Sequence, residues 1–209
     1  MKNQLSIGYN LKPIQICGGI ASGKTTLAAL LSRLNLVFVN ENFQSNPFWQ
    51  AFYADPVGTA FETEITFLLQ HYHQIKTAAK QAQAFACDFS LLLDLAYAHV
   101  TLNDAQRKVF RAVYRQIQSE LPKPDLVIHL SCDPEIELER IKRRGREAEQ
   151  SITVDYLAAL NAALIGVLET EAKSEDILRI DSGLIDFANS ESDQGKVLAM
   201  VRGRLGLAM

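Results

Sequence analysis

Ile14-Gln15-Ile16-Cys17-Gly18-Gly19-Ile20-Ala21-Ser22-Gly23-Lys24-Thr25-Thr26 is the stretch that decides the fold of this chain. It opens on an apolar run, passes through a glycine-rich turn, and leads into a segment whose leucines recur at helical spacing. The pattern G-x-x-x-x-G-K-[ST] is filled by Gly18, Gly23, Lys24 and Thr25. In a strand followed by a glycine-rich loop and a helix, the N–H groups of the loop and the positive end of the helix dipole point toward one anion. The stretch therefore predicts phosphate binding.

We call residues 18–26 the P-loop. Lys24 is expected to reach the outer phosphates of a nucleotide, and the Thr25 hydroxyl to face Mg²⁺. The alternative is a loop with a chance lysine, but the strand-like run before it and the helix-like segment after it favour a nucleotide site. The residues expected to bind ATP, or another nucleoside triphosphate, are Gly18, Gly19, Ile20, Ala21, Ser22, Gly23, Lys24, Thr25 and Thr26.

Length and composition limit the classes of protein. A chain of 209 residues with 48% hydrophobic residues suits one globular domain, expected over 1–209. The net charge of −3 argues against a general nucleic-acid or membrane-surface binder. No run of about 18 apolar residues occurs, and Met1–Lys12 lacks the apolar core of a signal peptide. The three cysteines contain no CxxC pair, which indicates reduced thiols and a cytoplasmic protein.

Alternation of short apolar runs with long helical patterns predicts an α/β fold. Each run is bounded by polar or turn residues, as expected of strands in a parallel sheet with helices on both faces. The predicted strands are Ile14–Cys17, Leu36–Val39, Ala84–Cys87, Leu126–Leu130 and Ile177–Ile180. Predicted helices follow the P-loop, begin near Thr59, Leu91, Asp104, Pro134 and Thr153, and end with one from about Ser192 to Leu205.

Acidic residues at strand ends are the candidate catalytic groups, since ligands bind beyond the carboxyl ends of parallel strands. Asp133 precedes Pro134 and is explained as a helix cap. Asp88 is a candidate partner of Mg²⁺ beside Thr25, and Glu41 a candidate base for removing a hydroxyl proton. The alternative for both is a solvated strand-end carboxylate.

Basic residues are clustered on both sides of Gly145: Arg140, Lys142, Arg143, Arg144 and Arg146. Arg140 and Arg144 lie one helical turn apart, and the glycine lets the chain bend after them. Arginines of a mobile lid, here about residues 140–152, can neutralise the charge of a moving phosphoryl group, although a solvated basic helix face is the alternative. The four histidines show no metal-ligand spacing and are expected to be structural, with His71 the possible exception.

Motifs along most of the chain resemble those of the deoxynucleoside kinase family, in its small bacterial deoxyadenosine, deoxyguanosine and deoxycytidine kinase type. The resemblance extends from Ile14 to about Leu205. The matching pieces are Gly18 to Thr26, Asn46-Pro47, Phe52-Tyr53-x-Asp55-Pro56, Phe61-x-Thr63-Glu64-x-x-Phe67-Leu68-Leu69, Asp88-Phe89, Tyr97-Ala98-x-x-Thr101-Leu102, Pro124-Asp125-Leu126-Val127-Ile128-x-Leu130 and Glu139-Arg140-Ile141-x-x-Arg144-Gly145-Arg146-x-x-Glu149.

The resemblance implies a five-stranded parallel sheet in the order 2-3-1-4-5, a homodimer formed through helices, and transfer of the γ-phosphoryl group of ATP to the 5′-hydroxyl of a deoxynucleoside. It implies Glu41 as general base and Asp88 near Mg²⁺ and the 5′ end of the substrate. It also implies that Tyr53 and Glu149 bind the sugar 3′-hydroxyl and that Phe61 lines the base pocket. The implied lid arginines are Arg140, Arg144 and Arg146.

Three departures from the family pattern concern the substrate side. Phe89 stands where the motif has arginine after its acidic residue, although bacterial members often carry an aromatic there. His71 replaces a frequent arginine, and Glu64 replaces the base-reading glutamine. An ionised glutamate only accepts hydrogen bonds and suits guanine N1–H and N2–H₂, whereas a protonated one partly imitates glutamine. The preferred nucleobase and the preferred phosphate donor therefore stay open.

Parts of the sequence also fit functions other than a nucleoside kinase. A P-loop kinase of another small hydroxyl substrate fits the same motifs. A regulatory nucleotide switch is favoured only by Asp55-x-x-Gly58, which follows no predicted strand and is accompanied by no N-K-x-D motif. A degenerate fold kept for binding alone would not require Lys24, Thr25, Glu41 and Asp88 together.

Overall fold

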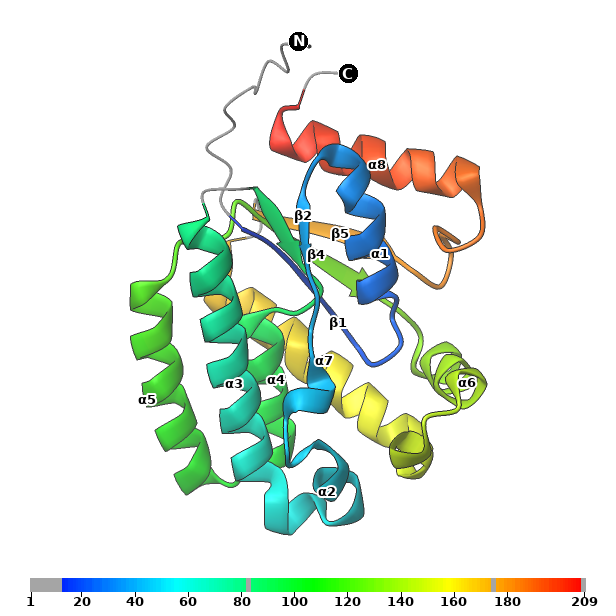
Figure 1. The fold of residues 1–209 in the computed structure, drawn as a ribbon. Coiled ribbons are helices and arrows are strands. Elements are labelled where there is room, and N and C mark those ends of the chain that lie inside the picture. The colour runs from blue at the N-terminus through cyan, green and yellow to red at the C-terminus, as the bar shows by residue number, and fades with distance from the viewer. Residues whose placement is uncertain (1–12, 82–83, 174–175, 208–209) are drawn as a thin grey trace.

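The computed structural model describes residues 13–81, 84–173 and 176–207. The polar stretch Met1–Lys12 and the outermost parts of the expected domain lie outside these residues. Five parallel strands form one sheet in the order β2-β3-β1-β4-β5, which confirms the expected fold class and strand order (Figure 1). The strands are β1 (Ile14–Gly18), β2 (Val37–Val39), β3 (Phe85–Cys87), β4 (Leu126–Ser131) and β5 (Ile177–Asp181).

Helices cover both faces of the sheet (Figure 1). They are α1 (Lys24–Leu31), α2 (Trp49–Ala54), α3 (Pro56–Lys80), α4 (Leu91–Thr101), α5 (Asp104–Glu120), α6 (Pro134–Arg144), α7 (Val154–Glu171) and α8 (Glu191–Leu205), with short 3₁₀ turns η1 (Ser32–Leu34), η2 (Phe43–Ser45) and η3 (Glu147–Ser151). Helix α3 begins before the predicted Thr59, because Pro56 takes its first position and the Asp55 side chain accepts from Gly58 N. The predicted caps Asp133 and Thr153 are confirmed.

Two hydrophobic layers hold the sheet between the helices. Ile14 and Ile16 of β1 pack in the layer that α1 and α8 cover, whereas Cys17 points into the larger layer with α4 and α7. This alternation follows from the two-residue period of a strand. Gln15, in the middle of β1, is 4% exposed, and its Oε1 accepts from Leu91 N at the start of α4.

The order of the strands positions the functional site. Strand β1 lies in the middle of the sheet, with β3 on one side and β4 on the other. The loops that follow β1 and its neighbours therefore lead away in opposite directions beyond the carboxyl end of β1. A crevice is expected at such a switch point. Within the described ranges, no helix has both the length and the apolar character required to cross a membrane.

Candidate active site

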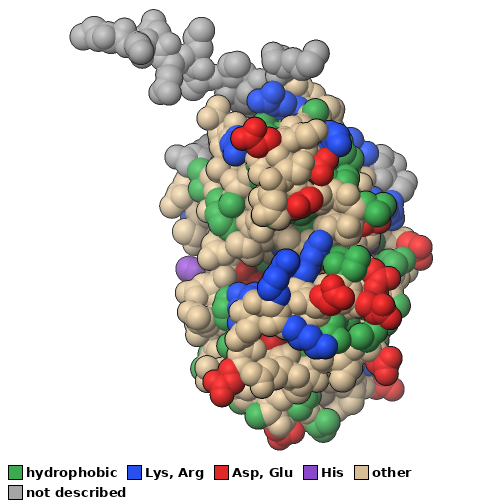
Figure 2. Space-filling model, turned by 90° about the vertical axis from the view of Figure 1, so that its right-hand side faces the viewer, with side chains coloured by type: hydrophobic (Ala, Val, Ile, Leu, Met, Phe, Trp, Pro, Cys, Tyr) green, Lys and Arg blue, Asp and Glu red, His purple; other side chains and the backbone are tan. Residues whose placement is uncertain are grey.

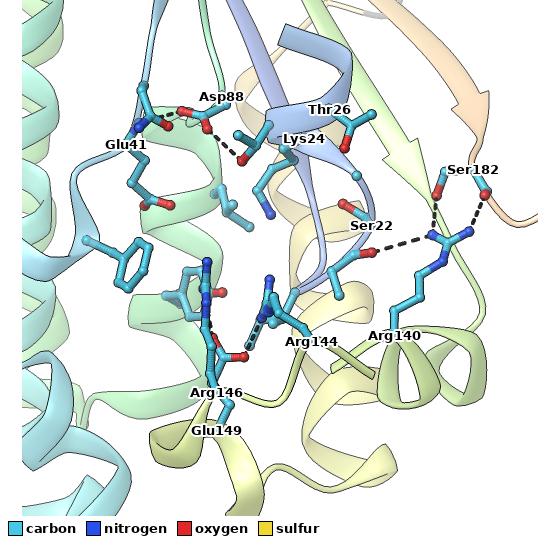
Figure 3. Close-up of a pocket in the computed structure, with 18 of the residues that line it drawn as sticks. Ser22, Lys24, Thr26, Glu41, Asp88, Arg140, Arg144, Arg146, Glu149 and Ser182 are labelled. Atoms are coloured by element: carbon cyan, nitrogen blue, oxygen red, sulfur yellow. Dashed lines mark hydrogen bonds and ion pairs between the residues drawn. The ribbon is translucent and has the colours of Figure 1, made fainter. Parts of the chain in front are cut away.

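A cavity of about 570 Å³ lies beyond the carboxyl ends of the strands. The P-loop and α6 form one part of its wall, and the segment after β2, α2, α3 and α4 form another. The close-up shows side chains from these segments directed into a shared space (Figure 3). The expected donor site and the expected acceptor site are therefore two ends of one cavity.

The conformation of the P-loop explains its glycines. Gly23 has a φ of 101°, in the left-handed region that side chains rarely adopt. A Cβ on Gly19 would lie 2.1 Å from Glu137 Oε1 and 2.5 Å from Asn161 Oδ1, so α6 and α7 pack directly against the loop. These contacts fix the loop backbone in the conformation that presents N–H groups to an anion.

Two polar side chains of the P-loop, Lys24 and Ser22, have no charged hydrogen-bond acceptor within the described residues. Lys24 Nζ donates to the loop carbonyls of Gly18 at 3.0 Å and Gly19 at 2.8 Å. Burial lowers the pKa of Lys24, while Glu41, Glu137 and Asp88 oppose that shift. The Ser22 hydroxyl is buried and makes no hydrogen bond within the described residues. A bound phosphate would supply both groups with charged acceptors.

Thr25, Asp88 and Glu41 are joined by hydrogen bonds, as Figure 3 shows for Asp88. Thr25 Oγ1 donates to Asp88 Oδ2 at 2.7 Å, and Glu41 N donates to Asp88 Oδ1 at 2.5 Å. Burial raises the pKa of Asp88, and these two hydrogen bonds oppose the rise. The hydroxyl and carboxylate oxygens are hard ligands of the kind Mg²⁺ takes alongside phosphate and water. In the described ranges, no group of three or more candidate metal-binding side chains occurs.

Glu41 projects into the cavity from the segment after β2 and lies beside a buried histidine. Its Oε1 is 3.3 Å from His71 Nε2. Burial alone would raise the pKa of Glu41, but His71, Lys24 and Arg146 outweigh it and lower the pKa. Glu41 is therefore ionised at neutral pH, as a proton acceptor must be.

The lid residues divide into two groups. Arg144 and Arg146 both form ion pairs with Glu149, which is 3% exposed, and extend toward the space between Glu41 and Lys24 (Figure 3). Arg140 instead donates to Ser182 O at 2.6 Å and Ala21 O at 3.4 Å, joining the end of β5 to the P-loop. The face that carries α6 shows a group of basic side chains with acidic ones nearby (Figure 2).

At the acceptor end, the structure places Tyr53, Glu64, Asp88 and Glu149 in the cavity wall but not Phe61. Phe67 lines the cavity instead. A helix turns by about 100° per residue, so residues 61 and 67 lie about 60° to either side of Glu64 around the axis of α3, and the cavity lies on the side of Phe67. Phe61 therefore does not line the cavity of this structure, and its role in the base pocket stays a prediction.

Sequence reasoning missed Asp94, a carboxylate in the cavity wall that is 4% exposed. Its oxygens lie 2.9 and 3.0 Å from His71 Nδ1. The available signal was a lone acidic residue in the apolar run Leu91-Leu92-Leu93-Asp94-Leu95. His71, the possible exception among the histidines expected to be structural, contacts two carboxylates of the cavity, Glu41 and Asp94.

A P-loop that faces a carboxylate and two arginines across one cavity is the arrangement of a P-loop phosphotransferase. The family model described as "Deoxynucleoside kinase" matches residues 14–205, and the chain belongs to the deoxynucleoside kinase family. Deoxyguanosine kinase of Bacillus subtilis (strain 168) is 29% identical over 197 residues, covering 90% of this chain and 95% of that protein. Deoxyadenosine kinase of Dictyostelium discoideum is 32% identical over 174 residues, covering 80% and 71%. A solved structure of deoxyadenosine kinase from M. mycoides, with the products dCMP and dCDP bound, superposes with a TM-score of 0.79 at 22% identity, covering 91% of this chain and 99% of that one.

Proposed function

We propose that this protein transfers the γ-phosphoryl group of ATP to the 5′-hydroxyl of a purine deoxynucleoside. The observation that carries the proposal is the position of Glu41 and Lys24 in one cavity, with Arg144 and Arg146 directed between them. Family membership and the relatives named deoxyguanosine kinase and deoxyadenosine kinase support the reaction and the purine.

The reaction needs one proton acceptor and charge neutralisation. Glu41 takes the proton of the 5′-hydroxyl as that oxygen bonds to the γ-phosphorus. The bond between the γ-phosphorus and the bridging oxygen breaks, and its electron pair leaves with ADP. Lys24, Arg144 and Arg146 neutralise the negative charge of the transferred group.

Thr25 and Asp88 are the residues that would hold Mg²⁺, which neutralises phosphate charge when bound. Segment 140–152 serves as the lid. Arg140 anchors its first helix to the P-loop and to the end of β5. The pairing of Arg144 and Arg146 with the buried Glu149 sets the positions of their guanidinium groups. Lid closure over the nucleotide would exclude water, which would otherwise compete with the 5′-hydroxyl.

The acceptor pocket recognises the sugar and the base at separate points. Tyr53 and Glu149 lie in its wall and can bind the 3′-hydroxyl together. The carboxylate of Glu149 would repel a phosphate at the 3′ position, which favours a nucleoside. At the base end, Glu64 and Asp94 provide oxygen acceptors, which suit the two adjacent donors of guanine.

The remaining expectations from the sequence belong to the same proposal. The chain acts as one domain in the cytoplasm, without a nucleic-acid partner, and assembles as a homodimer through helices. Val109 on α5 and Ile165 on α7 are apolar and exposed, at 52% and 47%, which supports a helical interface. Sedimentation of the protein with and without Ile165→Glu tests the dimer.

An ADP-release assay over deoxyguanosine, deoxyadenosine, deoxycytidine and thymidine, with ATP and GTP as donors, tests the function. Above about pH 8, where Glu64 is ionised, deoxyguanosine with ATP should be the fastest pair. Turnover confined to a hydroxyl compound that is not a nucleoside would favour another small-molecule kinase, and a clear pyrimidine preference would contradict the base assignment.

Two variants test the assigned roles. Glu41→Gln should lower kcat by about 10²-fold or more while ATP still binds, because the proton acceptor is lost. Arg144→Ala should lower kcat more than it raises KM, since its charge acts on the transferred group. Near-normal turnover in Glu41→Gln would remove this residue from the reaction.

A further inference from the structure

His71 lies at the centre of a buried chain of three ionisable groups. Its Nδ1 is 2.9 Å from Asp94 Oδ2, and its Nε2 is 3.3 Å from Glu41 Oε1. His71 comes from α3, Asp94 from α4 and Glu41 from the segment after β2. The imidazole therefore connects a carboxylate at the base end of the cavity with the carboxylate proposed to accept the substrate proton.

Two aromatic rings fix the plane of the imidazole. Phe89 stacks on it with ring centroids 4.1 Å apart and an interplanar angle of 9°. Phe67 approaches it at 5.9 Å and 31°. His71 is 3% exposed, so its ring cannot turn without displacing these neighbours. The stacking aims Nε2 at Glu41 and Nδ1 at Asp94.

The charges around the ring favour its protonated form. Burial disfavours an imidazolium, but Asp94 and Glu41 outweigh burial and raise the pKa of His71 to about 10. Glu64 faces the same ring from α3. A doubly protonated ring is positively charged and carries an N–H group on each nitrogen, so it attracts both carboxylates at once.

The two contacts of the ring differ in quality. Nδ1 meets both oxygens of Asp94 at hydrogen-bond distance. Nε2 is buried and reaches Glu41 as an ion pair, without the alignment of a hydrogen bond. Because Glu41 is 32% exposed, one side of its carboxylate stays open to the cavity. The contact restrains Glu41 and leaves oxygen lone pairs for a substrate hydroxyl.

We propose that His71 is a positioning residue for Glu41, held by Asp94 and by the Phe89 ring. The inference rests on the proposed role of Glu41. It accounts for two departures from the family pattern together, since Phe89 forms the surface on which His71 lies. In this arrangement, Asp94 balances the positive charge of the His71 ring. When Glu41 takes the substrate proton and becomes neutral, Asp94 still balances the buried imidazolium, so no cation is left unpaired.

Replacing His71 by asparagine or by glutamine tests the contributions of its two ring nitrogens separately. In His71→Asn the amide nitrogen takes the place of Nδ1 and keeps a donor toward Asp94. In His71→Gln it takes the place of Nε2 and keeps a donor toward Glu41. We expect kcat to fall about tenfold or more in His71→Asn, with KM for the deoxynucleoside changed less than about threefold. His71→Gln should recover most of the lost kcat.

Controls distinguish positioning from packing. His73→Asn, at an exposed position of the same helix, should leave kcat unchanged, and the melting temperature of each variant reports folding. Equal losses of kcat in the Asn and Gln variants would assign His71 to packing and overturn the proposal. A change confined to KM would assign it to base recognition, with the same consequence.

A second measurement does not depend on a variant at position 71. In histidine-labelled protein at fixed pH, the ring nitrogen resonances of His71 should shift in Glu41→Gln and in Asp94→Asn, whereas those of His73 stay in place. Unchanged resonances in Glu41→Gln would refute the contact. If the unsubstituted protein phosphorylates no nucleoside, the proposed function fails; if it is active and His71→Asn keeps its kcat, only this inference fails.

Discussion

The protonation state of Glu64 should decide which purine this kinase prefers, so that the preference changes with pH. Glu64 is 4% exposed, and its Oε1 accepts from Thr101 Oγ1 at 3.1 Å. Burial, followed by the charge of Asp94, raises the pKa of Glu64 to about 8, against the opposing effects of Thr101 and His71. Both forms of the carboxyl group are therefore populated at pH values where the enzyme can be assayed.

Each form is complementary to a different base edge. The ionised carboxylate only accepts and suits the N1–H and N2–H₂ donors of guanine. The protonated group donates once and accepts once, which suits N1 and N6–H₂ of adenine. Raising the pH removes the proton and favours guanine. The ratio of the two forms changes about tenfold per pH unit, which is about 1.4 kcal/mol, so kcat/KM for deoxyguanosine relative to deoxyadenosine should rise by up to that factor.

The assay is competitive phosphorylation of the two deoxynucleosides between about pH 6.5 and about pH 8.5, below the titration of guanine itself. Glu64→Gln donates and accepts at every pH, so its ratio should be flat and shifted toward deoxyadenosine. Thr101→Val removes a hydrogen bond that stabilises the ionised form and should move the change in preference to higher pH. A constant ratio in the unsubstituted protein, or the same slope in Glu64→Gln, would refute the reasoning.

Two further predictions concern the P-loop and the core. Gly19→Ala should reduce kcat/KM for ATP by about tenfold or more, because the added Cβ would lie 2.1 Å from Glu137 Oε1; Gly166→Ala in α7, where nothing lies within 4 Å, should keep full activity in the same assay. Leu68→Ala should lower the free energy of unfolding by about 2–5 kcal/mol in urea, since Leu68 is fully buried. Its neighbour Leu69 is 47% exposed, and Leu69→Ala should change that free energy by less than about 0.5 kcal/mol; equal effects of the two would contradict the packing.

The sequence predicted the sheet well because its signals are local. Each strand is a short apolar run, and the P-loop motif fixes where β1 ends and α1 begins. Parallel strands bring their carboxyl ends to one edge, which made Glu41 and Asp88 candidate site residues, and in the structure a hydrogen bond joins them. These inferences needed residue order and strand direction, and no knowledge of helix packing.

Contacts between helices were beyond such reasoning. Asp94 and His71 meet because α3 packs against α4, and no local pattern specifies which residues of two helices face each other. The same limit applies to Phe61. The sequence does not specify which face of α3 turns toward the cavity, and Phe67 rather than Phe61 lines it. Glu137 was not singled out either, although it is fully buried against Gly19 with burial raising its pKa to about 7.

The departures from the family pattern form one connected group. His71 lies between Asp94 and Glu41, Phe89 stacks on His71, and the charges of Asp94 and His71 act on Glu64. A side chain without a ring at position 71 would lose the ring-on-ring stacking with Phe89, and a neutral one would leave Asp94 buried without a cation, which is costly. A change at any of these positions therefore alters the others, so base choice and the position of the proton acceptor are coupled. The fold-loss of kcat caused by Glu64→Gln should then be larger in the His71→Asn background than in the unsubstituted protein, and equal fold-losses in the two backgrounds would argue against the coupling.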